Sequence, residues 1–230
     1  LIIEAAAQDS YYSEVTRRFL LPLQLTLTEP SDRSDLPGLA RTCSRLYGGR
    51  QPPGPARQDH HRPPGVIAWN PAQEWTGSGL VSSPRDLVIW AKALYEGRAM
   101  AGPYLDDLLA GVPIEAGDDS VQYGAGVTIM ADGPLGPSYG HGGWIPGYVS
   151  VLRYCPDHRI AIAIQIDTDD SVNLLSDMEL RLARTGVHRW SRVDAPVRIE
   201  DEPLGGLRLP DRAARQPDIR GVFALAHALH

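Results

Sequence analysis

A histidine set among glycines, just ahead of a strand-like run, most limits what this chain can form. Residues 139–148 read YGHGGWIPGY, and an apolar run continues to Tyr154. Glycine inside a strand marks a bulge, or a place where a ligand or another backbone comes very close. The ring of His141 would lie beside main-chain N–H groups, which can stabilise an oxyanion. The simpler interpretation is a glycine-rich turn with a solvent-facing histidine.

The composition favours one sizeable folded domain and excludes two classes of function. The chain has 230 residues, of which 43% are hydrophobic, and a formal net charge of −6. Because it has no basic stripe, we expect no nucleic-acid partner. Because no apolar run approaches the roughly 20 residues that cross a bilayer, we expect no membrane span.

The first residues carry neither an initiator methionine nor a basic leader region, so we expect the chain to begin inside a longer protein. The compartment therefore stays open between periplasmic or secreted and cytoplasmic, and the oligomeric state is unknown. Cys43 and Cys155 show no metal-ligand spacing. We expect two separate buried thiols, and a disulfide between them would need an oxidising compartment.

Helical periodicity appears in segments from both halves of the chain. Ser83 is an N-cap candidate, Pro84 suits the first helical position, Asp86 could reach back as in a capping box, and Gly97 ends the helix. Three further helices are expected: Tyr11–Leu20, capped by Asp9 or Ser10, Tyr104–Ala110 and Ser171–Thr185.

Strand patterns lie between these helices, at Gln122–Met130, Tyr148–Tyr154 and Arg159–Ile166. In the last, isoleucines line one face and alanines the other, so a helix can pack closely on the alanine side. We therefore predict an α+β fold with an antiparallel sheet flanked by helices over residues 1–190. Residues 28–75 are expected to form an irregular loop or lid, and 191–230 a weakly structured tail.

The order of these features resembles the serine β-lactamase and penicillin-binding-protein-like family, in its branch of class C β-lactamases, D-alanyl-D-alanine carboxypeptidases and esterases. The matching segments are LIIE at 1–4 with LPL at 21–23, GSGLVSSPRDL at 77–87, YGAG at 123–126 and GHGG at 140–143 with Pro146 and Gly147. They cover about residues 1–25 and 75–185. The resemblance implies a partial β-lactamase/transpeptidase-like fold.

The resemblance also implies roles for individual residues. His141 would stand at the basic position of the third catalytic motif, and the N–H of Trp144 would be one of two oxyanion-hole donors. Gly142 and Gly143 would let a substrate backbone lie against the strand, and Tyr123 would line the groove. The substrate would be a small molecule or peptide with an ester, amide or lactam carbonyl, and no metal or organic cofactor is implied. Gly142 replaces the family's frequent threonine or serine, which makes efficient β-lactam hydrolysis doubtful.

Two motifs of that family are missing from the sequence. A serine nucleophile in S-x-x-K needs a lysine three residues later, but the one lysine is Lys92 and residue 89 is Ile89. No tyrosine has an asparagine two residues on, so Y-x-N is absent as well. We therefore expect the C-terminal part of a serine hydrolase, truncated after its nucleophile and unable to acylate itself.

Other interpretations compete with this one. A hydrolase built on Ser78, His141 and an aspartate lacks a G-x-S-x-G elbow. A metal site at 59–61, where aspartate precedes two histidines, lacks partners at ligand spacing, and a solvated loop is the simpler account. A non-catalytic module that binds a peptide or cell-wall ligand stays open. Tyr123 could equally be an ordinary half-buried strand tyrosine.

Overall fold

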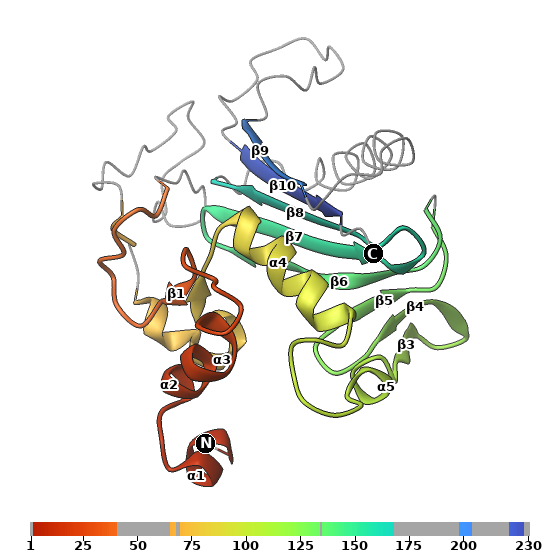
Figure 1. The fold of residues 1–230 in the computed structure, drawn as a ribbon, viewed down its shortest axis with the longest axis horizontal. Coiled ribbons are helices and arrows are strands. Elements are labelled where there is room, and N and C mark those ends of the chain that lie inside the picture. The colour runs from red at the N-terminus through yellow and green to blue at the C-terminus, as the bar shows by residue number, and fades with distance from the viewer. Residues whose placement is uncertain are drawn as a thin grey trace, which may run out of the picture.

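An eight-stranded antiparallel sheet organises the protein (Figure 1). The structure is a computed structural model that describes residues 2–40, 65–67, 70–133 and 135–167, together with the backbone of strands 198–203 and 221–227. The strand order is β3-β4-β5-β6-β7-β8-β10-β9. The strands are β3 Val112–Glu115, β4 Asp118–Tyr123, β5 Thr128–Met130, β6 Ser138–Ile145, β7 Tyr148–Cys155, β8 Ile160–Ile166, β9 Arg198–Pro203 and β10 Gly221–His227.

One long helix, α4 (Pro84–Tyr95), lies across the middle of this sheet (Figure 1). Its buried side chains pack on Ala161 and Ala163 of β8, which are fully buried. Alanine brings the helix close to the strand, as the sequence predicts. The isoleucines of β8 alternate with these alanines and are also buried, so both faces of β8 are covered. The predicted helix Ser171–Thr185 lies outside the described residues.

The start of α4 follows its sequence signals in part. The hydroxyl of Ser83 accepts a hydrogen bond from the N–H of Asp86 at 3.2 Å, which confirms the N-cap. The carboxylate of Asp86 is fully buried and accepts from the N–H of Leu27 at 2.8 Å and the hydroxyl of Thr28 at 2.9 Å. Asp86 therefore ties the N-terminal segment to α4.

The N-terminal part forms a small helical layer beside the sheet (Figure 1). It consists of α1 Ile2–Ala7, α2 Tyr11–Val15, the π-helical turn η1 Thr16–Leu20, β1 Glu29–Pro30, η2 Pro71–Gln73, α3 Trp75–Ser78 and β2 Leu80–Val81. Ser10 caps α2 by accepting from the N–H of Ser13 at 3.1 Å. The predicted helix Tyr11–Leu20 is therefore present, with its second half widened. Of the predicted irregular region 28–75, residues 41–64 and 68–69 lie outside the described residues.

The predicted strand Gln122–Met130 is wrong as a single element, because the chain reverses within it. Residues 124–127 form a turn between β4 and β5, closed by the N–H of Gly124 on the carbonyl of Val127 at 2.8 Å. Gly126 has φ +78, a conformation that glycine adopts without strain. The short helix expected at Tyr104–Ala110 is present as α5, Leu105–Leu108.

Two strands were not expected from the sequence at the C-terminal end. β9 and β10 fall in the range 191–230, whose composition predicts a weakly structured tail. β10 pairs along β8, with Phe223 opposite Ile164, and β9 pairs with β10. Edge strands gain their backbone hydrogen bonds by pairing, which periodicity alone does not reveal. The α+β class with an antiparallel sheet is confirmed.

In the part of the chain that the structure describes, no helix combines the length and apolar character of a membrane span.

Candidate functional site

Strand β6 is only partly covered on its β5 side. Its first residues, Ser138–Gly140, pair with β5, which starts at Thr128. The next five, His141–Ile145, pair with β7 alone among the described residues. We call the unpaired side of His141–Ile145 the open edge of β6. Backbone polar groups at such an edge can pair with an added extended chain.

His141 and Tyr123 are in direct contact at this edge. The phenolic Oη of Tyr123 lies 2.8 Å from Nε2 of His141, and the ring centroids are 5.7 Å apart with planes at 76°. Nδ1 of His141 makes a short contact with the carbonyl oxygen of Gly142. Both ring nitrogens are therefore engaged, although both side chains are exposed to solvent.

The three glycines around His141 differ in what they make room for. A side chain at Gly140 would place its Cβ 1.9 Å from the carbonyl oxygen of Leu152, so close strand packing requires this glycine. A Cβ at Gly142 would meet nothing nearer than the carbonyl oxygen of Ser150 at 3.9 Å, and one at Gly143 would lie 2.6 Å from the Ser150 hydroxyl. A side chain at position 142 would therefore have room, whereas one at position 143 would require the Ser150 hydroxyl to move.

Trp144 lies on the other face of β6 from His141. Tyr139 and Tyr154 both contact Tyr95 of α4, which sets the face of the odd-numbered β6 residues. Alternation along the strand then turns Trp144 away from α4, and its side chain is 48% exposed. Any role for Trp144 on the His141 side would therefore belong to its backbone.

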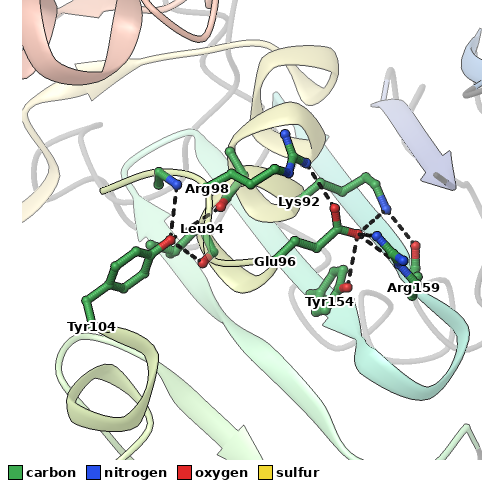
Figure 2. A network of polar contacts seen from close by, with 9 residues as sticks. Lys92, Leu94, Glu96, Arg98, Tyr104, Tyr154 and Arg159 are labelled. Atoms are coloured by element: carbon green, nitrogen blue, oxygen red, sulfur yellow. Dashed lines mark hydrogen bonds and ion pairs between the residues drawn. The ribbon is translucent and has the colours of Figure 1, made fainter. Parts of the chain in front are cut away.

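The single lysine of the chain is held in a polar cluster at the far end of α4 (Figure 2). Nζ of Lys92 donates to Oε1 of Glu96 and to the carbonyl of Arg159, both at 2.8 Å. Tyr154 and Arg98 also donate to Glu96, at 3.1 and 2.9 Å. Lys92 is buried, and it acts as a structural residue that joins α4 to the turn between β7 and β8.

Burial and charge set the ionisation of this cluster. Burial lowers the pKa of Lys92, against the opposing effect of Glu96. Burial also works to raise the pKa of Glu96, but the hydrogen bonds from Lys92 and Arg98 outweigh it and hold the pKa at about 2. Glu96 is therefore ionised at neutral pH.

The rival sites gain no support from the described residues. The hydrogen bonds of the His141 ring go to Tyr123 and Gly142, not to a serine or an aspartate. Ser78 lies at the end of α3 and is exposed. No group of three or more metal-ligand side chains occurs in the described ranges, and residues 59–61 fall outside them.

The bond between Tyr123 and His141 was not predictable from the sequence. The sequence indicates Tyr123 as a groove residue and His141 as a motif residue, but not the contact between them. The two residues are 18 positions apart. They meet because the turn at 124–127 starts β5 at Thr128, which pairs with Gly140, one residue before His141. The spacing of aromatic residues carries no signal for such a contact, because it depends on strand register.

A model of the Beta-lactamase family matches residues 1–184. Among solved structures, the chain is similar to a D-stereospecific amidohydrolase from Streptomyces sp., with 25% identity and a TM-score of 0.60 over 73% of this chain and 47% of that one. It is also similar to the D-amino acid amidase from Ochrobactrum anthropi SV3, complexed with L-phenylalanine amide (23% identity, TM-score 0.62, 80% of this chain, 54% of that one) or with D-phenylalanine (21%, 0.62, 80% and 57%).

The chain thus spans about half the length of these structures. No curated protein matches it. The family match covers α4, β6 and the Tyr123–His141 contact, and the antiparallel sheet agrees with it. The chain belongs to the beta-lactamase family.

Proposed function

We propose that this chain forms the sheet side of the active site of an acyl-serine hydrolase that cleaves amide or ester bonds. The nucleophile would come from polypeptide outside these 230 residues. The observation that carries the proposal is the open edge of β6, which carries His141 and Tyr123 in hydrogen-bond contact. An extended substrate can pair with such an edge and bring its carbonyl to the histidine.

The backbone of Trp144 is the proposed oxyanion donor. The carbonyl of Gly142 accepts a hydrogen bond from the His141 ring. This contact supports the view that the Gly142 carbonyl faces the open edge. Backbone groups two residues apart on a strand point to the same side, so the N–H of Trp144 would face that edge as well. An N–H fixed there can stabilise the negative charge that develops on a carbonyl oxygen under attack. Gly143 belongs to the same segment, and because it has no side chain it avoids a clash with the Ser150 hydroxyl.

The nucleophile is assigned elsewhere because the chain offers none with an activating lysine. Lys92 is buried, and it is engaged by Glu96 and the Arg159 carbonyl. A serine activated in the S-x-x-K manner needs its own lysine. The missing Y-x-N tyrosine would belong to the same outside segment.

Amides of amino acids are the proposed substrate class. One neighbouring structure holds L-phenylalanine amide and another D-phenylalanine. Gly142 has no hydroxyl with which to bind an anionic substrate group, and its surroundings are open. We therefore place amide or ester substrates ahead of β-lactams.

The experiment compares the 230-residue chain with the product of the same reading frame extended upstream. Both are incubated with D- and L-phenylalanine amide, a nitrophenyl ester and a chromogenic cephalosporin, and labelled with fluorescent penicillin. We expect turnover by the longer product alone, and a loss of about 10²–10⁴-fold in kcat/KM on His141→Ala. His158→Gln, on the turn after β7, is the matched control with unchanged activity. Turnover or covalent labelling of the 230-residue chain alone would contradict the assignment.

The alternative is a non-catalytic module that binds a peptide or cell-wall ligand at the same edge. The open backbone groups favour it as much as they favour catalysis. Binding of a D-amino acid amide by the longer product without turnover, measured by calorimetry, would decide for the module.

A further inference from the structure

Both nitrogens of the His141 ring are already used within the protein. Nδ1 contacts the carbonyl oxygen of Gly142, an acceptor, so Nδ1 must carry a proton. In the neutral ring Nε2 is then the acceptor, and the Tyr123 hydroxyl at 2.8 Å must donate to it. The ring has no free nitrogen to offer a ligand in this arrangement.

Unlike the imidazole, the Tyr123 side chain still has a free hydrogen-bond acceptor within the described part of the chain. Its oxygen donates one hydrogen bond to His141 and keeps lone pairs for another partner. The side chain is 40% exposed and belongs to the last residue of β4, next to the open edge of β6. In the described residues, the hydrogen bonds of the Tyr123 and His141 side chains reach only each other and the Gly142 carbonyl.

We infer that Tyr123 Oη, and not the imidazole, is the atom that this site presents to a substrate. His141 acts behind it as the Nδ1–H tautomer and accepts the hydrogen bond of its hydroxyl. The role of Tyr123 toward a substrate rests on the proposed function. The tautomer of His141 rests on the hydrogen bonds alone.

No proton is transferred within the pair. The proton of the outside nucleophile goes to the lysine that activates it. Tyr123 keeps its own proton directed at Nε2, so its oxygen acts as an acceptor, and the substrate group that it fits is an N–H donor. The Gly142 carbonyl keeps the Nδ1 proton throughout, which holds the ring in one orientation.

The tautomer can be measured without any activity. Histidine ring nitrogens of the ¹⁵N-labelled chain are recorded at pH ~8.5, about two units above the ordinary pKa of histidine. We expect the proton of His141 on Nδ1, with coupling from the Tyr123 hydroxyl proton to Nε2. Tyr123→Phe should shift the Nε2 signal and remove the coupling while the proton stays on Nδ1, whereas Tyr139→Phe, a hydroxyl deletion on the same strand as His141, should change neither. A proton found on Nε2, or a Tyr123→Phe spectrum identical to that of the unaltered chain, would overturn the inference.

The catalytic part needs the active longer product. We expect Tyr123→Phe and His141→Ala each to lower kcat about 100-fold, and the double variant to lose no more than either single variant, because two groups that act as a unit are not additive. Additive losses, or full activity in Tyr123→Phe, would show that the imidazole meets the substrate directly. No turnover by the unaltered longer product would contradict the proposed function, whereas the nitrogen spectrum decides the hydrogen-bond arrangement independently.

Discussion

At the residue scale, the glycines of β6 differ in why a side chain is absent. Gly140 is fixed by the neighbouring strand, because any Cβ would enter the Leu152 carbonyl, which is backbone and cannot rotate away. Gly142 has no such neighbour. Close packing therefore requires Gly140 but not Gly142, although both look alike in sequence.

This difference gives the first prediction. Gly140→Ala should lower the free energy of unfolding by about 3 kcal/mol, since β6 or β7 must move. Gly142→Ala should change it by less than about 0.5 kcal/mol, as for an exposed position without contacts. Urea unfolding followed by circular dichroism measures both. Equal effects of the two substitutions would contradict the packing role given to Gly140.

Gly142→Ser tests what the missing hydroxyl does to selectivity. The added side chain has room and would project from the Trp144 face of β6, beside the open edge, where a substrate carboxylate could accept from its hydroxyl. In the longer product we expect kcat/KM for a cephalosporin to rise about 10-fold relative to D-phenylalanine amide, equivalent to one added hydrogen bond of about 1.4 kcal/mol. Gly142→Ala, which adds bulk without a hydroxyl, is the control. An equal change in both variants would assign the effect to bulk.

At the element scale, Asp86 links α4 to the N-terminal layer. Its carboxylate is fully buried and accepts from Leu27 and Thr28. Asp86→Ala should therefore lower the free energy of unfolding by about 3 kcal/mol, because the Leu27 and Thr28 donors lose a charged acceptor. Ser83→Ala should lower it by about 1 kcal/mol, because the N-cap of α4 is lost. Asp106→Ala, on the exposed first turn of α5, is the control. Thermal unfolding compares them, and a Ser83→Ala loss larger than that of Asp86→Ala would contradict the link.

Glu96 makes stability depend on pH in a defined window. Its pKa falls from 4.5 to about 2 on folding, so its stabilising effect is complete above pH 4.5 and is lost as the pH falls toward 2. Glu96→Gln should destabilise the protein by about 3 kcal/mol at pH 7, since Lys92 stays buried without its carboxylate, and should flatten the acid limb of the stability curve. Glu115→Gln, on exposed β3, is the control. An unchanged slope between pH 4.5 and 2 in Glu96→Gln would contradict this account.

The elements that the sequence predicts well are those whose burial imposes a period. α4 and β8 pack against each other, so their apolar spacing follows their geometry. The turn at 124–127 interrupts an apolar run without a polar break, and β3 has an exposed residue at each position, so neither leaves a periodic signal. The candidate site was predicted as a histidine motif, but the Tyr123 contact depends on register, which a single sequence does not encode locally.

At the scale of the whole molecule, the sheet is asymmetric about β6. On one side β7 pairs with it from Tyr139 to Ile145, β8 pairs with β7 in turn, and α4 packs on these two strands (Figure 1). On the other side β5 covers only three of its residues. β6 therefore pairs along its length on one side and keeps an open edge on the other, so the exposed His141 stands on hydrogen-bonded backbone.

The other side of β8 gives the last prediction. β10 pairs with all seven residues of β8, from Ile160 to Ile166, and β9 follows it. Deleting residues 191–230 removes both strands and leaves a long, apolar β8 as a sheet edge, the kind of edge that pairs with another chain. We expect the shortened chain to self-associate, as measured by light scattering across a concentration series. Deleting 228–230 keeps β10 and should leave the association state unchanged.

A charge on that edge should reverse the effect. Gln165 is the one residue of β8 that is not fully buried, so Gln165→Lys can place an ammonium group at the exposed strand with little cost to the core. In the chain that lacks 191–230, this substitution should restore the association state of the intact protein, because an added strand would have to desolvate the charge. If the shortened chain shows no greater association than the intact one, β10 does not protect β8 in solution, and the sheet ends at β8.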